Sequence, residues 1–272
     1  MSEAERPPHA VLVRSPEKFS PTAVAGVLAR RARAPALDFA ARARRAWGVA
    51  AESLPAVEAE SLAADLTAAG QAALAVPTSL LELPPEPVLA AKAELSSEGF
   101  DLVAGRANAA PERLSWTRLA AICAAGVEER TSKTVTETAP VDMGEQAVRL
   151  GLTMATGIPL MKSAKQTKRV VETRDRAFVL DLLFLEPSRR VRMDARAFDF
   201  SVLGAKMGYG AEANFLLLVE ELVARGPRAL RGRGTRALLA RRPAADSLYE
   251  SLDDLAREER WLLTLSVLRA AL

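Results

Sequence analysis

The chain has little of what most enzyme sites are built from. Its 272 residues include a single histidine, His9, and a single cysteine, Cys123. One histidine excludes a metal site made of several histidines, and one cysteine excludes an internal disulfide and fits a reducing compartment. His9 lies at the start of an apolar run of strand length, and Cys123 lies within the run AICAA, so we expect a strand-edge histidine and a buried thiol. The sequence predicts no metal site and no cofactor.

Motifs of nucleophilic catalysis and of phosphate binding are also absent from the sequence. No serine stands in a Gly-x-Ser-x-Gly elbow, and no glycine-rich turn is followed by Lys-Ser or Lys-Thr. An enzyme would have to work with carboxylates and arginines, for example Asp142 and Glu145, whose spacing indicates no particular reaction. We therefore expect a non-enzymatic protein.

Long apolar runs are missing as well. The longest, such as residues 178–185 and 215–219, are far shorter than the roughly 20 residues that a helix needs to cross a bilayer, so no membrane association is predicted. The N-terminus MSEAERPP is acidic and contains proline, unlike a signal peptide, and we expect a cytoplasmic protein. The formal charge of +3 is too small to indicate nucleic-acid binding by the chain as a whole.

The composition is ordinary for a globular protein, with 49% apolar and 26% charged residues, and the length suits roughly two domains. Residues 83–87, LPPEP, interrupt any helix or strand, because proline lacks the N–H donor and restricts the residue before it. We predict a first domain over residues 1–82, a proline-rich linker over residues 83–98 and a second domain over residues 99–272.

The first domain is predicted to fold as strand, helix, helix, strand, helix and strand. Ser20 and Pro21 give the first helix a capping oxygen and a fixed φ, and Pro35 starts a second helix. Pro55 opens the third helix and Gly70 ends it, since glycine accepts the left-handed conformation that closes a helix. The strands are expected near residues 9–14, 48–54 and 71–76.

The order of these elements, ending in the helix and strand LAADLTAAGQAALAV, resembles the C-terminal domain of the bacterial ribosomal stalk protein, a fold shared with the Clp protease adaptor. The resemblance covers about residues 9–77 and concerns topology. It implies a small domain that binds other proteins. The stalk family meets translation factors through a glycine-rich turn and two lysines. Here residues 33–41 contain no glycine and have Asp38 and Ala41 near the lysine positions, so factor binding is not implied.

The second domain is predicted to have a mainly antiparallel sheet and C-terminal helices, which makes the chain α+β. Apolar runs over residues 177–185 and 191–200 predict two strands, and helical periodicity predicts helices from residue 213 onward. Residues 128–176 mix threonines, lysines and isolated apolar patches without sustained periodicity. We expect a long loop or a disordered insertion there.

A glycine cluster lies between the last predicted strand and a predicted helix, where backbone amides can meet an anion. Its spacing differs from that of a dinucleotide fingerprint. The sequence favours a simple connection that uses glycine for positive φ. If the domain holds a small ligand, the residues expected to bind it are Lys206, Gly208, Tyr209 and Gly210.

Arginines are concentrated in residues 225–242, and such clusters can neutralise phosphates. Acidic residues follow closely, and no aromatic residues interleave with the arginines to stack bases, which favours a solvated surface. We therefore predict a non-enzymatic binding or adaptor protein that acts through a protein partner. RNA binding is the alternative, with Arg228, Arg231, Arg233 and Arg236 as the contacts to nucleic acid.

Overall fold

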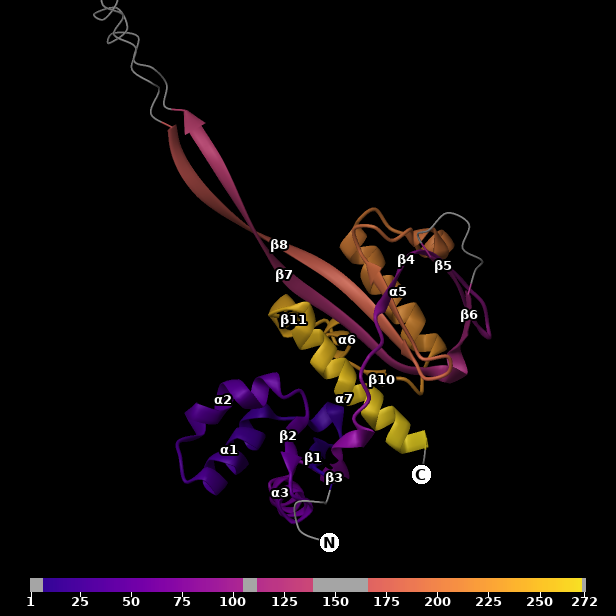
Figure 1. The fold of residues 1–272 in the computed structure, drawn as a ribbon. Helices are drawn as coiled ribbons and strands as arrows, with labels where there is room; N and C mark the ends of the chain where they lie inside the picture. The colour runs from indigo at the N-terminus through magenta and orange to yellow at the C-terminus, as the bar shows by residue number, and fades with distance from the viewer. Residues whose placement is uncertain (1–6, 105–111, 139–165, 271–272) are drawn as a thin grey trace, which may run out of the picture. The chain divides into compact units, whose positions relative to one another are not determined.

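The computed structural model of the chain describes residues 7–104, 112–138 and 166–270 (Figure 1). It contains helices together with one antiparallel and one mixed sheet, so the predicted α+β class is confirmed. Two compact units are distinguished: Met1–Glu128 with Arg176–Leu272, and Glu129–Asp175. Of the second unit, the structure describes two strand segments, residues 129–138 and 166–175.

The N-terminal region follows the predicted order of strands and helices. Its elements are β1 (His9–Val13), a 3-10 turn (Pro16–Lys18), α1 (Pro21–Ala32), α2 (Ala36–Arg45), β2 (Val49–Leu54), α3 (Ala56–Ala68), β3 (Ala73–Pro77) and a second 3-10 turn (Thr78–Leu80). β1 pairs antiparallel with β2 on one side and with β3 on the other. As predicted, Ser20 caps α1, because its Oγ accepts a hydrogen bond of 3.3 Å from the backbone N–H of Ala23.

A larger mixed sheet is built by the rest of the chain. Its strands are β4 (Pro87–Leu95), β5 (Gly99–Ala104), β6 (Glu112–Ser115), β7 (Leu119–Thr138), β8 (Gln166–Phe184), β9 (Arg189–Asp194), β10 (Leu230–Arg231) and β11 (Leu248–Tyr249). They lie in the order β10, β7, β8, β9, β4, β5, β6, with β11 also paired to β7. The helices that accompany this sheet are α5 (Ala211–Arg225), α6 (Arg233–Leu239) and α7 (Leu252–Ala270), coloured orange to yellow in Figure 1.

The predicted linker over residues 83–98 is wrong for most of its length, because Pro87–Leu95 form strand β4. This strand pairs in parallel with β9 and antiparallel with β5, and it buries Ala90 and Ala93. Proline does not prevent the strand, since Pro87 is its first residue, a position where a missing N–H donor is tolerated.

The predicted loop over residues 128–176 is wrong at both of its ends. β7 continues to Thr138 and β8 begins at Gln166. These strand ends are rich in threonine and valine, whose branched side chains favour extended backbone. The middle of the predicted insertion, residues 139–165, lies outside the described residues, and so do Asp142 and Glu145.

Alternation of side chains along the strands gives the large sheet two faces. On one face, Ile122 and Leu180 belong to a buried cluster that includes the apolar side of α5. On the other face, Cys123 and Val179 belong to a second cluster with α7 and the N-terminal strands. Cys123 is therefore buried, as expected, and its burial raises the pKa of the thiol well above the usual range.

The same alternation places charge inside the protein, next to α7. Asp181 of β8 lies opposite Arg192 of β9 in the strand register, and Arg190 is two residues along. The Asp181 carboxylate accepts hydrogen bonds from Arg192 Nε and Nη2 at 2.8 and 2.6 Å, and from Arg190 Nε at 2.9 Å. Arg190 Nη2 also lies 2.7 Å from Glu259 Oε2 on α7. We call these four buried residues the sheet charge cluster.

The two carboxyls of the sheet charge cluster are in different states. Burial favours a high pKa for Asp181, but hydrogen bonds from Arg192 and the charges of both arginines bring its pKa below the usual value. Burial and the negative charge of Asp181 raise the pKa of Glu259 well above its usual range. Asp181 is therefore the ionised partner of the arginines, and Glu259 is held towards its neutral form.

α7 also completes the core of the N-terminal region. The indole Nε1 of Trp261 donates a hydrogen bond of 2.8 Å to the carbonyl of Val13 in β1, and the indole packs against Phe19 with ring centroids 5.2 Å apart. Gly48, which has a φ of 80°, lies so close to the same indole that a Cβ there would overlap it. The boundary predicted at residue 82 stays a prediction, and the structure places both sides of it in one compact unit.

Candidate functional site

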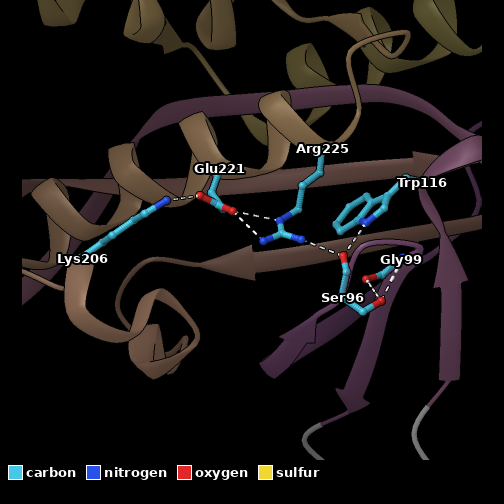
Figure 2. Close-up of polar contacts among 6 residues, drawn as sticks. All are labelled: Ser96, Gly99, Trp116, Lys206, Glu221 and Arg225. Atoms are coloured by element: carbon cyan, nitrogen blue, oxygen red, sulfur yellow. Dashed lines mark hydrogen bonds and ion pairs between the residues drawn. The ribbon is translucent and has the colours of Figure 1, made fainter.

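The glycine-containing segment singled out in the sequence lies just before α5, and Lys206 within it already has a partner (Figure 2). Lys206 Nζ lies 2.7 Å from Glu221 Oε2, and the other oxygen of Glu221 accepts hydrogen bonds from Arg225. Hydrogen bonds from Lys206 and Arg225 hold the pKa of Glu221 below its usual value. Arg225 Nη1 and the Trp116 indole both donate to the carbonyl of Ser96, at 2.7 and 3.0 Å. Figure 2 thus shows a polar chain that fastens the β4–β5 turn to α5.

The other residues of this segment that the sequence predicts to bind a ligand are Gly208, Tyr209 and Gly210. The N–H of Gly208 donates to Asn214 Oδ1 at 2.7 Å, and Asn214 Nδ2 donates back to the carbonyl of Gly208 at 3.1 Å. Gly210 is the residue before α5, and Tyr209 is fully exposed. That this segment binds a ligand stays a prediction. The side chain of Lys206 and the backbone N–H of Gly208 are already hydrogen-bonded within the protein.

The four arginines predicted to contact nucleic acid fall into two pairs. Arg233 and Arg236 of α6 are partly buried and line a cavity of about 660 Å³. Arg228 and Arg231 are not among the residues that line it, and Arg228 is exposed. The fold therefore places two of the predicted arginines in the wall of one cavity, and the other two do not line it.

We name this space the arginine cavity, after the five residues Arg44, Arg45, Arg233, Arg236 and Arg242 in its walls. Its walls come from residues 16–21, the end of α2, α6, residues 242–250 and α7. These segments are distant in sequence and meet because α7 packs on the N-terminal strands through Trp261.

Arg233 is fixed in the wall by two aromatic rings. Its guanidinium carbon lies 4.9 Å from the ring centroid of Trp47 and 4.8 Å from that of Tyr249, within the range of cation–π attraction. The two rings stack on each other with centroids 5.0 Å apart. One of its Nη atoms also donates to the carbonyl of Leu248. The position of this charge is thus set before any ligand arrives.

A buried carboxyl lies behind Arg233. Glu258 of α7 accepts a hydrogen bond of 2.7 Å from the backbone N–H of Arg233, and its other oxygen is hydrogen-bonded to the hydroxyl of Tyr249. Burial raises the pKa of Glu258, although Tyr249 and the nearby arginines act in the opposite direction. Burial and the adjacent Glu258 also raise the pKa of the Tyr249 hydroxyl well above its usual range.

The arginine cavity has more positive than negative charge. Of its arginines, Arg45 alone forms an ion pair with a carboxylate, Glu250, at 3.5 Å, when the described residues are considered. Among the carboxylates in its walls, Asp254 pairs with Arg257 at 2.7 Å, and burial raises the pKa of Glu258. Among the described residues, Arg44, Arg233, Arg236 and Arg242 form no side-chain ion pair with a carboxylate, and neither do Glu17 and Asp246. Because Asp254 is neutralised by Arg257, which does not line the cavity, the five arginines exceed the four other carboxyl groups of the walls even when Glu258 is ionised. The cavity is therefore suited to a negatively charged group.

Replacement of Glu258 by glutamine should reveal the protonation of this carboxyl. Because the folded protein holds the Glu258 proton more tightly than the unfolded chain does, its contribution to stability is complete at acid pH and is lost as the pH rises towards the raised pKa. The variant Glu258→Gln has no such proton. Between about pH 4 and about pH 7, we expect the difference in the free energy of unfolding to shift in favour of the variant, as measured by urea denaturation. A difference that does not change with pH would contradict a raised pKa.

Metal sites and membrane-spanning helices are absent from the described residues. No group of three or more His, Cys, Asp or Glu side chains could hold a metal ion there, and no described helix is long and apolar enough to span a membrane. His9 lies at the first position of β1, with its Nδ1 2.9 Å from the carbonyl of Pro7, as expected for a strand edge. Searches for similar proteins find no matching family model, no matching curated protein and no matching solved structure.

Proposed function

We propose that this protein is a non-enzymatic binding protein that holds an acidic segment of a partner protein in the arginine cavity. The observation that carries the proposal is the charge of the cavity, in whose walls four arginines form no ion pair with a carboxylate of the described residues. A ligand of opposite charge gains a faster encounter and specificity from such a surface. The volume of about 660 Å³ falls within the roughly 300–1,000 Å³ of typical ligand pockets.

The arrangement of the titratable groups supports binding rather than catalysis. Glu258 and Tyr249 are the groups of the cavity wall with raised pKa values, and they are hydrogen-bonded to each other. Their exposed fractions are 1% and 2%, so neither presents a proton to the open space. Their role in this geometry is to hold the backbone and the guanidinium of Arg233.

An acidic peptide suits the cavity better than RNA does. Binding of single-stranded RNA relies on aromatic faces that are open to bases. The structure does place aromatic rings beside an arginine, but Trp47 and Tyr249 are only 8% and 2% exposed, and Arg233 lies against both rings. A base could stack there only by displacing Arg233. Carboxylates need no stacking surface and accept charge-assisted hydrogen bonds from guanidinium groups.

Calorimetric titration with a capped triglutamate peptide tests the proposal. We expect binding that weakens as salt rises above about 0.15 M. The double variant Arg44→Gln/Arg242→Gln removes two exposed arginines of the cavity that form no ion pair with described residues, and should weaken binding about tenfold.

The matched control for this titration is Arg228→Gln/Arg269→Gln. It removes the same net charge from exposed positions that do not line the cavity, and should leave the affinity within about twofold of wild type. Equal losses in both double variants, or no binding of the peptide at all, would contradict the proposal. Tighter binding of oligouridylate than of peptide, weakened by Arg228→Gln, would favour the RNA alternative.

A further inference from the structure

A second hollow, of about 530 Å³, lies next to the arginine cavity. Arg45 lines both spaces. A second link is the ion pair of 2.7 Å between Asp254, which lines the arginine cavity, and Arg257, which lines the hollow. The two spaces are thus neighbours, because Arg45 lines both and this ion pair joins a residue of one lining to a residue of the other. The other arginines of the hollow are Arg42 of α2 and Arg260 of α7.

The hollow has more arginines than carboxylates in its walls. Arg260 is neutralised by Glu52, which accepts two hydrogen bonds from it at 2.8 and 2.9 Å, and Arg257 is paired with Asp254. Arg42 is exposed and forms no ion pair with any described residue. Glu52 is the one carboxylate among the described residues that line the hollow, and it is paired with Arg260. Arg45 is paired with Glu250, so Arg42 is the arginine that adds positive charge beside the cavity.

We infer that the cavity and the hollow form one continuous site for an extended polyanionic peptide, whose acidic side chains occupy both spaces. Three extended residues span about 10 Å, which is comparable with the width of a cavity of about 660 Å³. The residues that follow in a longer acidic segment must leave the cavity, and the route past Arg45 brings them to Arg42. This inference rests on the proposed function and specifies the partner: a segment of consecutive acidic residues rather than a single carboxylate.

The test compares two capped peptides, triglutamate and nonaglutamate, on the wild-type protein and on Arg42→Glu. Nonaglutamate spans about 30 Å when extended and can fill both spaces, whereas triglutamate can fill one. We expect Arg42→Glu to weaken binding of nonaglutamate by about fivefold or more, and binding of triglutamate by less than about twofold. Arg242→Glu, in the cavity, should weaken both peptides. Arg228→Glu, with the same change in charge outside both spaces, should affect neither.

The outcomes separate this inference from the proposed function. If both peptides bind but Arg42→Glu leaves nonaglutamate unaffected, the continuous site is wrong and the cavity proposal stands. If neither peptide binds the wild-type protein, both are wrong. If oligouridylate of nine nucleotides binds in an Arg42-dependent way and nonaglutamate does not, the surface serves nucleic acid. Arg42→Gln, which avoids a negative charge at the end of α2, repeats the comparison if the glutamate variant melts at lower temperature than wild type.

Discussion

Replacement of Asp181 by alanine is expected to lower the free energy of unfolding by about 3–5 kcal/mol. The carboxylate of Asp181 receives three hydrogen bonds from Arg190 and Arg192, and all of these groups are buried. Without this carboxylate, the two buried guanidinium groups are still shielded from solvent. Glu259 is then the one carboxyl that remains in the cluster. Burial of an uncompensated charge is far more costly than the loss of one hydrogen bond. Urea denaturation of the whole chain measures the effect.

The protein offers a matched control on the same sheet. Asp101 also accepts two hydrogen bonds from one arginine, Arg113 Nε and Nη2 at 2.7 and 2.8 Å, but this pair lies at the surface. Solvent and salt screen such pairs, so Asp101→Ala should cost far less than Asp181→Ala. Equal losses in the two variants would show that the sheet charge cluster is not held away from water as described.

Replacement of Gly48 by alanine is the second change with a large expected effect, a loss of roughly 2–5 kcal/mol in the free energy of unfolding. A φ of 80° costs a residue with a Cβ about 1–2 kcal/mol. The methyl group would also overlap the indole of Trp261, and overpacking of a core costs typically 1–3 kcal/mol. The indole of Trp261 cannot move aside easily, because its Nε1 donates a hydrogen bond to the carbonyl of Val13 and its ring packs on Phe19.

Gly70→Ala separates the two causes. Gly70 has the same φ of 80°, but a Cβ there would meet nothing within 4 Å. It should show the conformational cost alone, and the difference between the two variants then measures the overlap with Trp261. If the two variants are equally stable, the close packing of Gly48 on the indole is wrong. Thermal and urea denaturation give both values.

Much of the fold could be predicted because it follows from local signals. Ser20 with Pro21, Pro35 and Gly70 mark the limits of helices by rules that act within a few residues: α1 begins at Pro21, α2 begins directly after Pro35, and α3 ends two residues before Gly70. β4 was missed because the prolines before it outweighed a weak apolar pattern, in which only Ala90 and Ala93 are buried and their spacing of three residues is not the alternation of a regular strand. The outer parts of β7 and β8 were missed because their residues lack the apolar periodicity on which the prediction relied.

The candidate site could be predicted only in part, because it depends on contacts between distant segments. Arg233 and Arg236 were identified from a local cluster, but Arg44 and Arg45 lie far from them in the sequence and line the same cavity only in the folded chain. The absence of aromatic residues near these arginines in the sequence was misleading, since Trp47 reaches Arg233 only in the folded chain. The sheet charge cluster did leave a signal: an aspartate within the apolar run FVLDLLF, followed by a strand with alternating arginines.

The packing of Trp261 on Val13 and Gly48 also orders events during synthesis of the chain. Translation proceeds from the N-terminus, so β1, α2 and the Gly48 turn leave the ribosome about two hundred residues before the indole that covers them. Until α7 emerges, the N-terminal core lacks the indole of Trp261 and the arginine cavity lacks one wall. A nascent chain without α7 therefore lacks the complete arginine cavity, and the partner site that we propose there forms only after α7 has been made.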